Sequence, residues 1–342
     1  MNRQRQPWER LDEVAEHRQL CRARIEHLVE VREPLVLISQ IQRSCGTLLS
    51  QLLDAHPECH AHAQELKIGH PRKGKWPPLD LGRPEEWYRM LYEPRLGKDL
   101  VRGYRKSPRP EEADVFPFLF SSRLQKAIFD HCVESNAIER ERDVLDCYFT
   151  SYFNAWLDNQ NLYTRPKKVV TGFAARLGVD LASVGRFFAV YPDGTLFSIV
   201  RRPQAWYDSS RKLDSAERHG WHEVDNALAF WRRGTDAVLA AYARYGDRMV
   251  VITYDQLVGD TETTMRYLAE RIGISMSPIL LSPTFNGRPI RANSSERVER
   301  HGVLPERAES YRRSLDAETI ARIDELAGDL YDRAASIAAP QT

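Results

Sequence analysis

Residues 42–49 read QRSCGTLL and follow PLVLIS (residues 34–39), a short apolar run with β-branched residues. The next stretch, SQLLDAHPE (residues 50–58), continues with a helical pattern that ends near His56-Pro57. A strand, a tight turn containing glycine and a helix aim several backbone N–H groups and the positive end of the helix dipole at one point. The sequence therefore predicts an anion-binding turn after the first strand.

This turn differs from the common nucleotide-binding loop G-x-x-x-x-G-K-[ST] in its cation. The lysine of that loop is missing, and Arg43 stands at the beginning of the turn instead. A nucleotide kinase remains an alternative, because its fold and phosphate turn would give a similar pattern. A kinase would need both a P-loop lysine and a motif of magnesium ligands, and the sequence has neither motif.

The composition narrows the class of protein. The 342 residues include 49 Lys+Arg and 48 Asp+Glu, so the net charge of +1 gives no electrostatic reason to bind nucleic acid. Five cysteines without paired spacing fit a reducing compartment better than a disulfide framework. The first 20 residues are charged throughout, and no apolar run is long enough to span a bilayer. We therefore expect a cytoplasmic protein that is not transmembrane.

Short apolar strands alternate with helical patterns along the chain. Strands are expected at residues 34–39, 167–171, 195–200 and 248–253. Helices are expected at residues 8–31, 44–55, 121–137, 143–160, 180–190, 203–213, 222–245 and 316–331. This order predicts an α/β fold with a central parallel sheet flanked by helices on both faces.

A second basic turn, Arg201-Arg202-Pro203, follows the strand pattern TLFSIV (residues 195–200). Proline is well tolerated at the start of a helix, so a helix should begin at or near Pro203. Ligands of parallel sheets lie at the carboxyl ends of the strands, and both basic turns follow strands. Either turn alone could be an ordinary connection with a surface ion pair. Together they predict two separated anion pockets that hold a ligand with phosphates at its two ends.

Several motifs in this order resemble the sulfotransferases that use 3′-phosphoadenosine-5′-phosphosulfate (PAPS). The motifs are RSCGTLL (43–49), LLDAHPE (52–58), R-x-P at 201–203 with Ser209 eight residues after its arginine, VITYDQLV (251–258), PTFNG (283–287) and NSS (293–295). The likeness spans roughly residues 34 to 331. The loop is most similar to bacterial members with tyrosylprotein-sulfotransferase-like motifs.

The resemblance implies a P-loop-like sulfotransferase fold, PAPS as cosubstrate, its product 3′,5′-adenosine bisphosphate (PAP), and no metal. The residues implied around the 5′-phosphosulfate are Arg43, Ser44, Cys45, Gly46, Thr47 and Leu48. Those implied at the 3′-phosphate are Arg201 and Ser209, and Asn293 with Ser294 or Ser295 would lie in a loop that covers the donor.

Two positions depart from the family pattern. Cys45 stands where glycine is usual, so the backbone is less free to take a positive φ. Arg202 replaces the common aspartate of R-D-P, which would add a cation near the phosphate. Tyr254-Asp255 are expected to close a strand and to cap a short helix.

The expected chemistry needs a cation and a base. A permanently charged Arg43 can neutralise the departing phosphate without a metal ion. Glu65 lies within one residue of the spacing at which the family places its catalytic glutamate, and His60 and His62 are rival bases.

Lys168 is a further catalytic candidate, because many relatives have a lysine at a corresponding place. Here it follows Lys167 and precedes the strand pattern VVT, so the two lysines could equally flank an edge strand. The run HPECHAH (residues 56–62) suggests zinc only superficially, since no second cluster with ligand spacing accompanies it.

We expect one sulfotransferase domain over residues 34–334, an N-terminal helix within residues 1–33 and a mostly helical or loop insertion over 67–165 on the acceptor side. Aromatic residues and arginines in 67–123 would suit a ring, a sugar or an anionic acceptor, or else belong to an ordinary helical insertion. The expected acceptor is a hydroxyl or amine of a small molecule, a glycan or a lipid. A homodimer is compatible with this interpretation. A non-catalytic nucleotide-binding relative is the remaining alternative.

Overall fold

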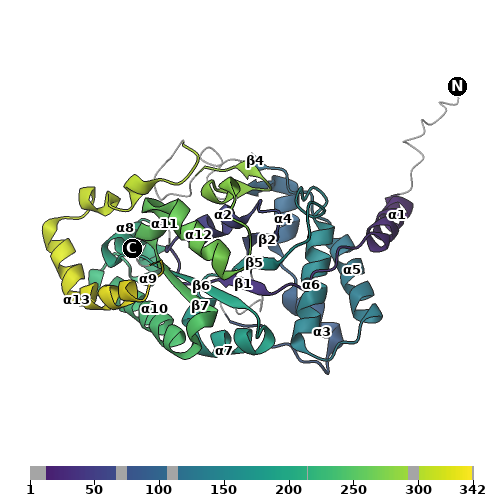
Figure 1. Ribbon diagram of the computed structural model, residues 1–342, viewed down its shortest axis with the longest axis horizontal. Helices are drawn as coiled ribbons and strands as arrows, with labels where there is room; N and C mark the ends of the chain where they lie inside the picture. Colours follow the sequence, from purple (N-terminus) through teal and green to yellow (C-terminus); the bar gives the residue numbers. More distant parts are fainter. Residues whose placement is uncertain (1–12, 67–74, 106–114, 214, 292–299, 341–342) are drawn as a thin grey trace.

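The centre of the protein is a five-stranded parallel sheet (Figure 1). The computed structural model describes residues 13–66, 75–105, 115–213, 215–291 and 300–340. The strands are β1 (Leu35–Ile38), β2 (Cys59–Glu65), β5 (Val169–Phe173), β6 (Thr195–Val200) and β7 (Met249–Thr253). They lie in the order β2-β5-β1-β6-β7, and every pairing is parallel. The predicted α/β class is confirmed.

Helices cover both faces of this sheet, because successive side chains of each strand point to opposite sides. In β1, Leu35 and Leu37 pack into one hydrophobic core, and Val36 and Ile38 pack into the other. Helices of the second core are α2 (Gly46–Leu53), α11 (Tyr254–Gly259) and α12 (Thr261–Arg271). Helices of the first core include α7 (Leu181–Val190), α10 (Val224–Tyr245) and α13 (Ala317–Ser336). In Figure 1, α11 and α12 lie above the strands, and α7 and α10 lie below them.

A mostly helical segment connects β2 to β5. It contains α3 (Pro84–Leu91), α4 (Arg95–Arg102), the short strands β3 (Tyr104–Arg105) and β4 (Val115–Phe116), α5 (Ser122–Ser135) and α6 (Glu141–Ala155). The N-terminal helix α1 (Glu13–Glu26) packs on α5 at the same end of the molecule (Figure 1). Side chains of α6 such as Tyr148 and Phe153 are fully buried, so this segment extends the first core.

The described residues also form α8 (Pro203–Arg211), α9 (Ala216–His219) and the hairpin of β8 (Thr284–Phe285) and β9 (Arg288–Pro289). They include 3₁₀ helices at Leu177–Val179, Gly246–Arg248, Pro278–Leu281, Pro305–Arg307 and Ser310–Arg313. Pro203 is the first residue of α8, as predicted, and the Asp316 carboxylate caps α13 by accepting a hydrogen bond from the Thr319 N–H. None of the helices in the described ranges is both long and apolar enough to cross a membrane.

The edge strand β2 is absent from the sequence prediction. Its residues, CHAHAQE, alternate small apolar residues with His60, His62 and Gln64, and because these polar side chains are buried too, the strand lacks the continuous apolar run of the other strands. Tertiary contacts compensate for this polarity. His62 Nε2 lies 3.3 Å from Glu93 Oε1, and Gln64 donates to Asp99.

Candidate active site

The turn after β1 has an unusual backbone. Arg43 and Cys45 both have φ 70°, in the left-handed region that favours glycine. Cys45 nevertheless serves as the N-cap residue of α2, and its carbonyl accepts hydrogen bonds from the N–H groups of Leu48 (2.9 Å) and Leu49 (3.2 Å). The cysteine therefore takes the conformation expected of the glycine that it replaces, at a cost in backbone strain.

Gly46 is required by close packing. A Cβ atom on this residue would lie 2.0 Å from Gln40 Nε2 and 2.3 Å from Phe173 Cε2. The second contact is the more restrictive, because the ring of Phe173 belongs to β5 and cannot rotate away like the end of a flexible chain. Only glycine lets this turn approach the end of β5 so closely.

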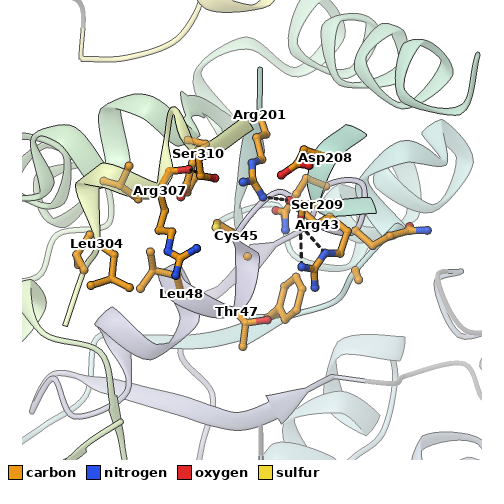
Figure 2. Close-up of a pocket in the computed structure, with 18 of the residues that line it drawn as sticks. Arg43, Cys45, Thr47, Leu48, Arg201, Asp208, Ser209, Leu304, Arg307 and Ser310 are labelled. Atoms are coloured by element: carbon orange, nitrogen blue, oxygen red, sulfur yellow. Dashed lines mark hydrogen bonds between the residues drawn. The ribbon is translucent and has the colours of Figure 1, made fainter. Parts of the chain in front are cut away.

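The two basic turns form one continuous site (Figure 2). Arg43 donates from Nε and Nη2 to Ser209 Oγ, at 3.0 and 2.7 Å. Arg201 Nη1 donates to the carbonyl oxygen of Arg43 at 3.0 Å. The turns meet because β1 and β6 are neighbours in the sheet. The two turns therefore line one cavity, not two separate ones, and the two anion positions within it stay a prediction.

That cavity has a volume of about 260 Å³. It brings together eight of the residues predicted from the sequence: Arg43, Cys45, Gly46, Thr47, Leu48, Glu65, Arg201 and Ser209. Ser44 is the exception within the turn. Its side chain is buried outside the lining, and its Oγ has no hydrogen-bond partner among the described residues.

The electrostatics of the cavity favour an anion. Burial, followed by the charge of Arg201, lowers the pKa of Arg43. Arg201 is 9% exposed, its guanidinium lies 4.4 Å from the centre of the Tyr254 ring, and its Nε has no hydrogen-bond partner within the described part of the chain. The carboxylate of Asp208 also lines the cavity, but it is compensated by Lys212 at 2.8 Å and by Ser314.

Other parts of the lining come from residues that the sequence analysis did not single out. Figure 2 shows Leu304, Arg307 and Ser310 across the cavity from Arg43. Tyr254, which the sequence analysis treated as structural, also lines it. No local pattern marks the segment that holds Arg307, so only the tertiary structure identifies it.

Arg202 pairs with Asp255 instead of lining the cavity, and this corrects an expectation. Its guanidinium binds Asp255 Oδ2 at 3.1 Å and lies 5.3 Å from the centre of the Tyr331 ring. It is absent from the lining, so it adds no cation there. Asp255 is not a helix cap either. Thr253 caps α11 by accepting a hydrogen bond from the Gln256 N–H at 3.1 Å.

Glu65 is the candidate base that the fold brings to the cavity. It is the last residue of β2, at the carboxyl end of the sheet, and is half-buried. His60 and His62 lie outside the lining. Burial lowers the pKa of His60 to about 3, and the ring of His62 is stacked on Tyr152 with 4.1 Å between centroids.

Lys168 directly precedes β5, so it lies at the amino end of the strands, opposite to the end that carries Glu65. Its Nζ binds Glu58 Oε1 at 2.8 Å and the carbonyl oxygen of Gly273 at 3.0 Å. The structure therefore does not bring Lys168 together with the other candidate residues. The predicted residues Asn293, Ser294 and Ser295 lie outside the described residues.

The run HPECHAH does not assemble a metal site. His56 Nε2 lies 2.9 Å from the carbonyl oxygen of Ser275. Over the described ranges of the chain, no group of three or more His, Cys, Asp or Glu side chains is arranged to hold a metal ion.

The aromatic side chains of the predicted insertion do not form an exposed platform. Trp76, Trp87, Tyr104 and Phe116 are all buried in the first core, and Tyr88 is partly buried against it. Tyr104 stacks on Phe285 with 3.7 Å between ring centroids. These four rings support the fold, so their presence in the sequence carries no information about the acceptor.

A sequence profile described as Sulfotransferase family matches residues 34–278, and the chain therefore belongs to this family. Family membership supports sulfuryl transfer as the general chemistry. No curated protein matches the chain in sequence.

Solved structures similar to this chain include two described as sulfotransferases and one described as a retinol dehydratase. The sulfotransferase domain from the curacin biosynthetic pathway is 14% identical with a TM-score of 0.49, over 88% of this chain and 99% of that one. A sulfotransferase from Mycobacterium avium is 15% identical with a TM-score of 0.40, over 94% and 81%. Retinol dehydratase, in a complex with retinol and PAP, is 12% identical with a TM-score of 0.36, over 95% and 88%.

Proposed function

We propose that this protein transfers a sulfuryl group from PAPS to a hydroxyl or amine of an acceptor. The observation that carries the proposal is the convergence of Arg43, Arg201 and Ser209 on one cavity whose lining includes Glu65. The first three side chains provide charge and hydrogen-bond donors for an anion, and the fourth provides a proton acceptor.

The cavity fits the phosphates of the donor in two respects. Arg201 is buried with its Nε lacking a hydrogen-bond partner among the described residues, which an anionic oxygen would supply. The turn of Arg43 to Gly46 leads into the N-terminus of α2, where N–H groups and the helix dipole favour negative charge. Arg201 and Ser209 would hold the 3′-phosphate, and Arg43 with the loop from Ser44 to Leu48 would hold the 5′ side.

PAPS supplies an activated sulfuryl group attached to a phosphate. The positively charged guanidinium of Arg43 stabilises negative charge placed beside it. This group stays protonated even though burial lowers its pKa. Glu65 accepts a proton from an acceptor group placed within about 3 Å of its carboxylate. Glu65 ends β2 and Arg43 lies in the turn between β1 and α2, so the fold positions both residues, which reduces the cost of orientation.

The same proposal covers the acceptor, which would be a small molecule, a glycan or a lipid. It would approach Glu65 from the side of the insertion, which we assign to residues 67–165 of a sulfotransferase domain spanning 34–334 and preceded by an N-terminal helix within 1–33. The loop with Asn293 and Ser294 would cover the donor.

Calorimetry with PAP, followed by a transfer assay with sulfur-labelled PAPS and a panel of acceptors, tests the proposal. We expect PAP to bind and 5′-AMP, which lacks the 3′-phosphate, to bind far more weakly. Binding of ATP with magnesium but not of PAP would favour a nucleotide kinase. Binding of PAP without transfer to any acceptor would favour a non-catalytic relative.

A further inference from the structure

We propose that Cys45 is a site of covalent modification, at which an anionic disulfide forms a mixed disulfide inside the anion-binding cavity. The geometry sets Cys45 apart from the other cysteines of the chain. It lines the cavity and is partly exposed, whereas Cys59, Cys132 and Cys147 are buried. Cys21 is partly exposed but lies on α1, outside the cavity.

Positive charge surrounds the Cys45 thiol. Figure 2 shows its sulfur between the side chains of Arg201, Arg307 and Arg43. Cys45 is also the N-cap residue of α2, where the helix dipole stabilises a negative charge. Neighbouring arginines and a helix N-terminus are the features that favour the reactive thiolate form of cysteine. The interaction is mutual, because a negative charge at Cys45 raises the pKa of Arg43.

A second, independent feature of the cavity attracts the reagent itself. Arg201 is nine-tenths buried, lines the same cavity and has an Nε without a hydrogen-bond partner among the described residues. A carboxylate or other anionic group can satisfy this donor. A disulfide that carries such a group is therefore drawn to the cavity before it meets the thiolate.

The reaction is a thiol–disulfide exchange. The Cys45 thiolate attacks one sulfur of the reagent, a new S–S bond forms, and the original S–S bond breaks. The departing thiolate stays in solution as the anion or takes a proton from water, according to its own pKa. A small thiol in excess reverses the exchange. The bound half of the reagent then occupies space beside Arg43 and Arg201, so it blocks the donor; this last consequence rests on the proposed function.

The test uses the full chain and two disulfides, the anionic 5,5′-dithiobis(2-nitrobenzoate) and the neutral 4,4′-dithiodipyridine. Absorbance gives the rate of each reaction, peptide mass spectrometry identifies the cysteine, and each rate is divided by that of the same reagent with 2-mercaptoethanol. We expect the anionic reagent to be favoured at Cys45 by about tenfold at low salt, and this preference to fade at high salt.

Two variants locate the effect. The fast reaction should vanish in Cys45→Gly and persist in Cys21→Ser, and PAP should slow it in the unaltered protein. Equal normalised rates for the two reagents at Cys45, or faster modification of Cys21, would overturn the inference. An unreactive Cys45 in a protein that binds PAP overturns the inference and leaves the proposed function standing. A reactive Cys45 in a protein that does not bind PAP overturns the proposed function and leaves the modification site standing.

Discussion

The guanidinium of Arg43 donates two hydrogen bonds to the hydroxyl of Ser209, which lies 166 residues later in the chain. Arg43 follows β1 and Ser209 belongs to α8, which follows β6. The contact joins the two turns into one unit, together with the bond from Arg201 to the Arg43 carbonyl. A change in one turn should therefore alter the behaviour of the other.

Ser209→Ala should weaken PAP binding by about tenfold, because a hydroxyl bonded to a charged group contributes about 1.5 kcal/mol. The substitution also releases Arg43 from its two hydrogen bonds. Calorimetry with PAP measures the change. Ser282→Ala is the matched control, since Ser282 is exposed and lies outside the cavity. The affinity of this variant for PAP should equal that of the unaltered protein. Equal affinities in both variants would contradict a role for Ser209.

Arg201→Met and Arg202→Met compare two adjacent arginines with different environments. Arg201→Met should weaken PAP binding by about 100-fold, because it removes a buried cation that faces the ligand. Arg202→Met should leave PAP affinity unchanged and cost at most about 1 kcal/mol of stability, since its pair with Asp255 is partly exposed. Calorimetry and urea unfolding separate the two effects. Similar losses of affinity in both variants would argue against the assignment of Arg201.

Glu65→Gln should slow sulfuryl transfer by about 10²-fold or more while PAP affinity stays the same, because the amide cannot accept the acceptor's proton. Initial rates with labelled PAPS measure the loss. Glu58→Gln is the control, since Glu58 lies just before the same strand at its other end and binds Lys168. An unchanged rate in Glu65→Gln would exclude this carboxylate as the base.

The pair of Glu58 and Lys168 should make stability depend on acidity. The Glu58 carboxylate accepts hydrogen bonds from Lys168 and from the Ser275 N–H, and these bonds lower the pKa of Glu58 from 4.5 to about 2. The unfolded chain therefore binds more protons between these two values, so the stabilisation is complete above pH 4.5 and is lost as the pH falls towards 2. Urea unfolding over this range should show a smaller decline in Glu58→Gln than in the unaltered protein. Parallel curves for the two proteins would refute the assignment.

Cys45→Gly should be more stable than Cys45→Ala by about 1 kcal/mol, since the residue has φ 70° and only glycine takes that conformation without strain. Both variants remove the sulfur, so the comparison isolates the backbone. Urea unfolding gives the difference. If alanine proved equal to glycine or better, the left-handed conformation of this residue would be in doubt.

Much of the fold was predictable because local patterns determine it. The apolar runs that become β1, β5, β6 and β7 are short and continuous, as buried parallel strands require. β2 could not be found in this way, because its buried histidines and Gln64 are stabilised by partners such as Glu93 and Asp99 that are remote in sequence.

The candidate site was predictable where a turn follows a strand, as at Arg43 and Arg201. The prediction that Lys168 belongs to the site could have been rejected on geometry alone. A residue that precedes a parallel strand lies at the amino end of the sheet, and residues that follow a strand lie at the carboxyl end. Tyr254 directly follows β7, so the same geometry could have placed it at this end of the sheet. Arg307 reaches the cavity through tertiary packing alone, and its sequence context gives no signal.

The proximity of Arg43 and Arg201 lowers the stability of the fold but serves the proposed activity. Arg201 is buried and Arg43 is partly buried, and the charge of Arg201 disfavours the charge of Arg43. A protein selected only for resistance to heat would replace one of them with an apolar side chain. The presence of both arginines indicates that the fold tolerates repulsion between their two positive charges. A bound anion would offset this repulsion, because both guanidinium groups would attract it.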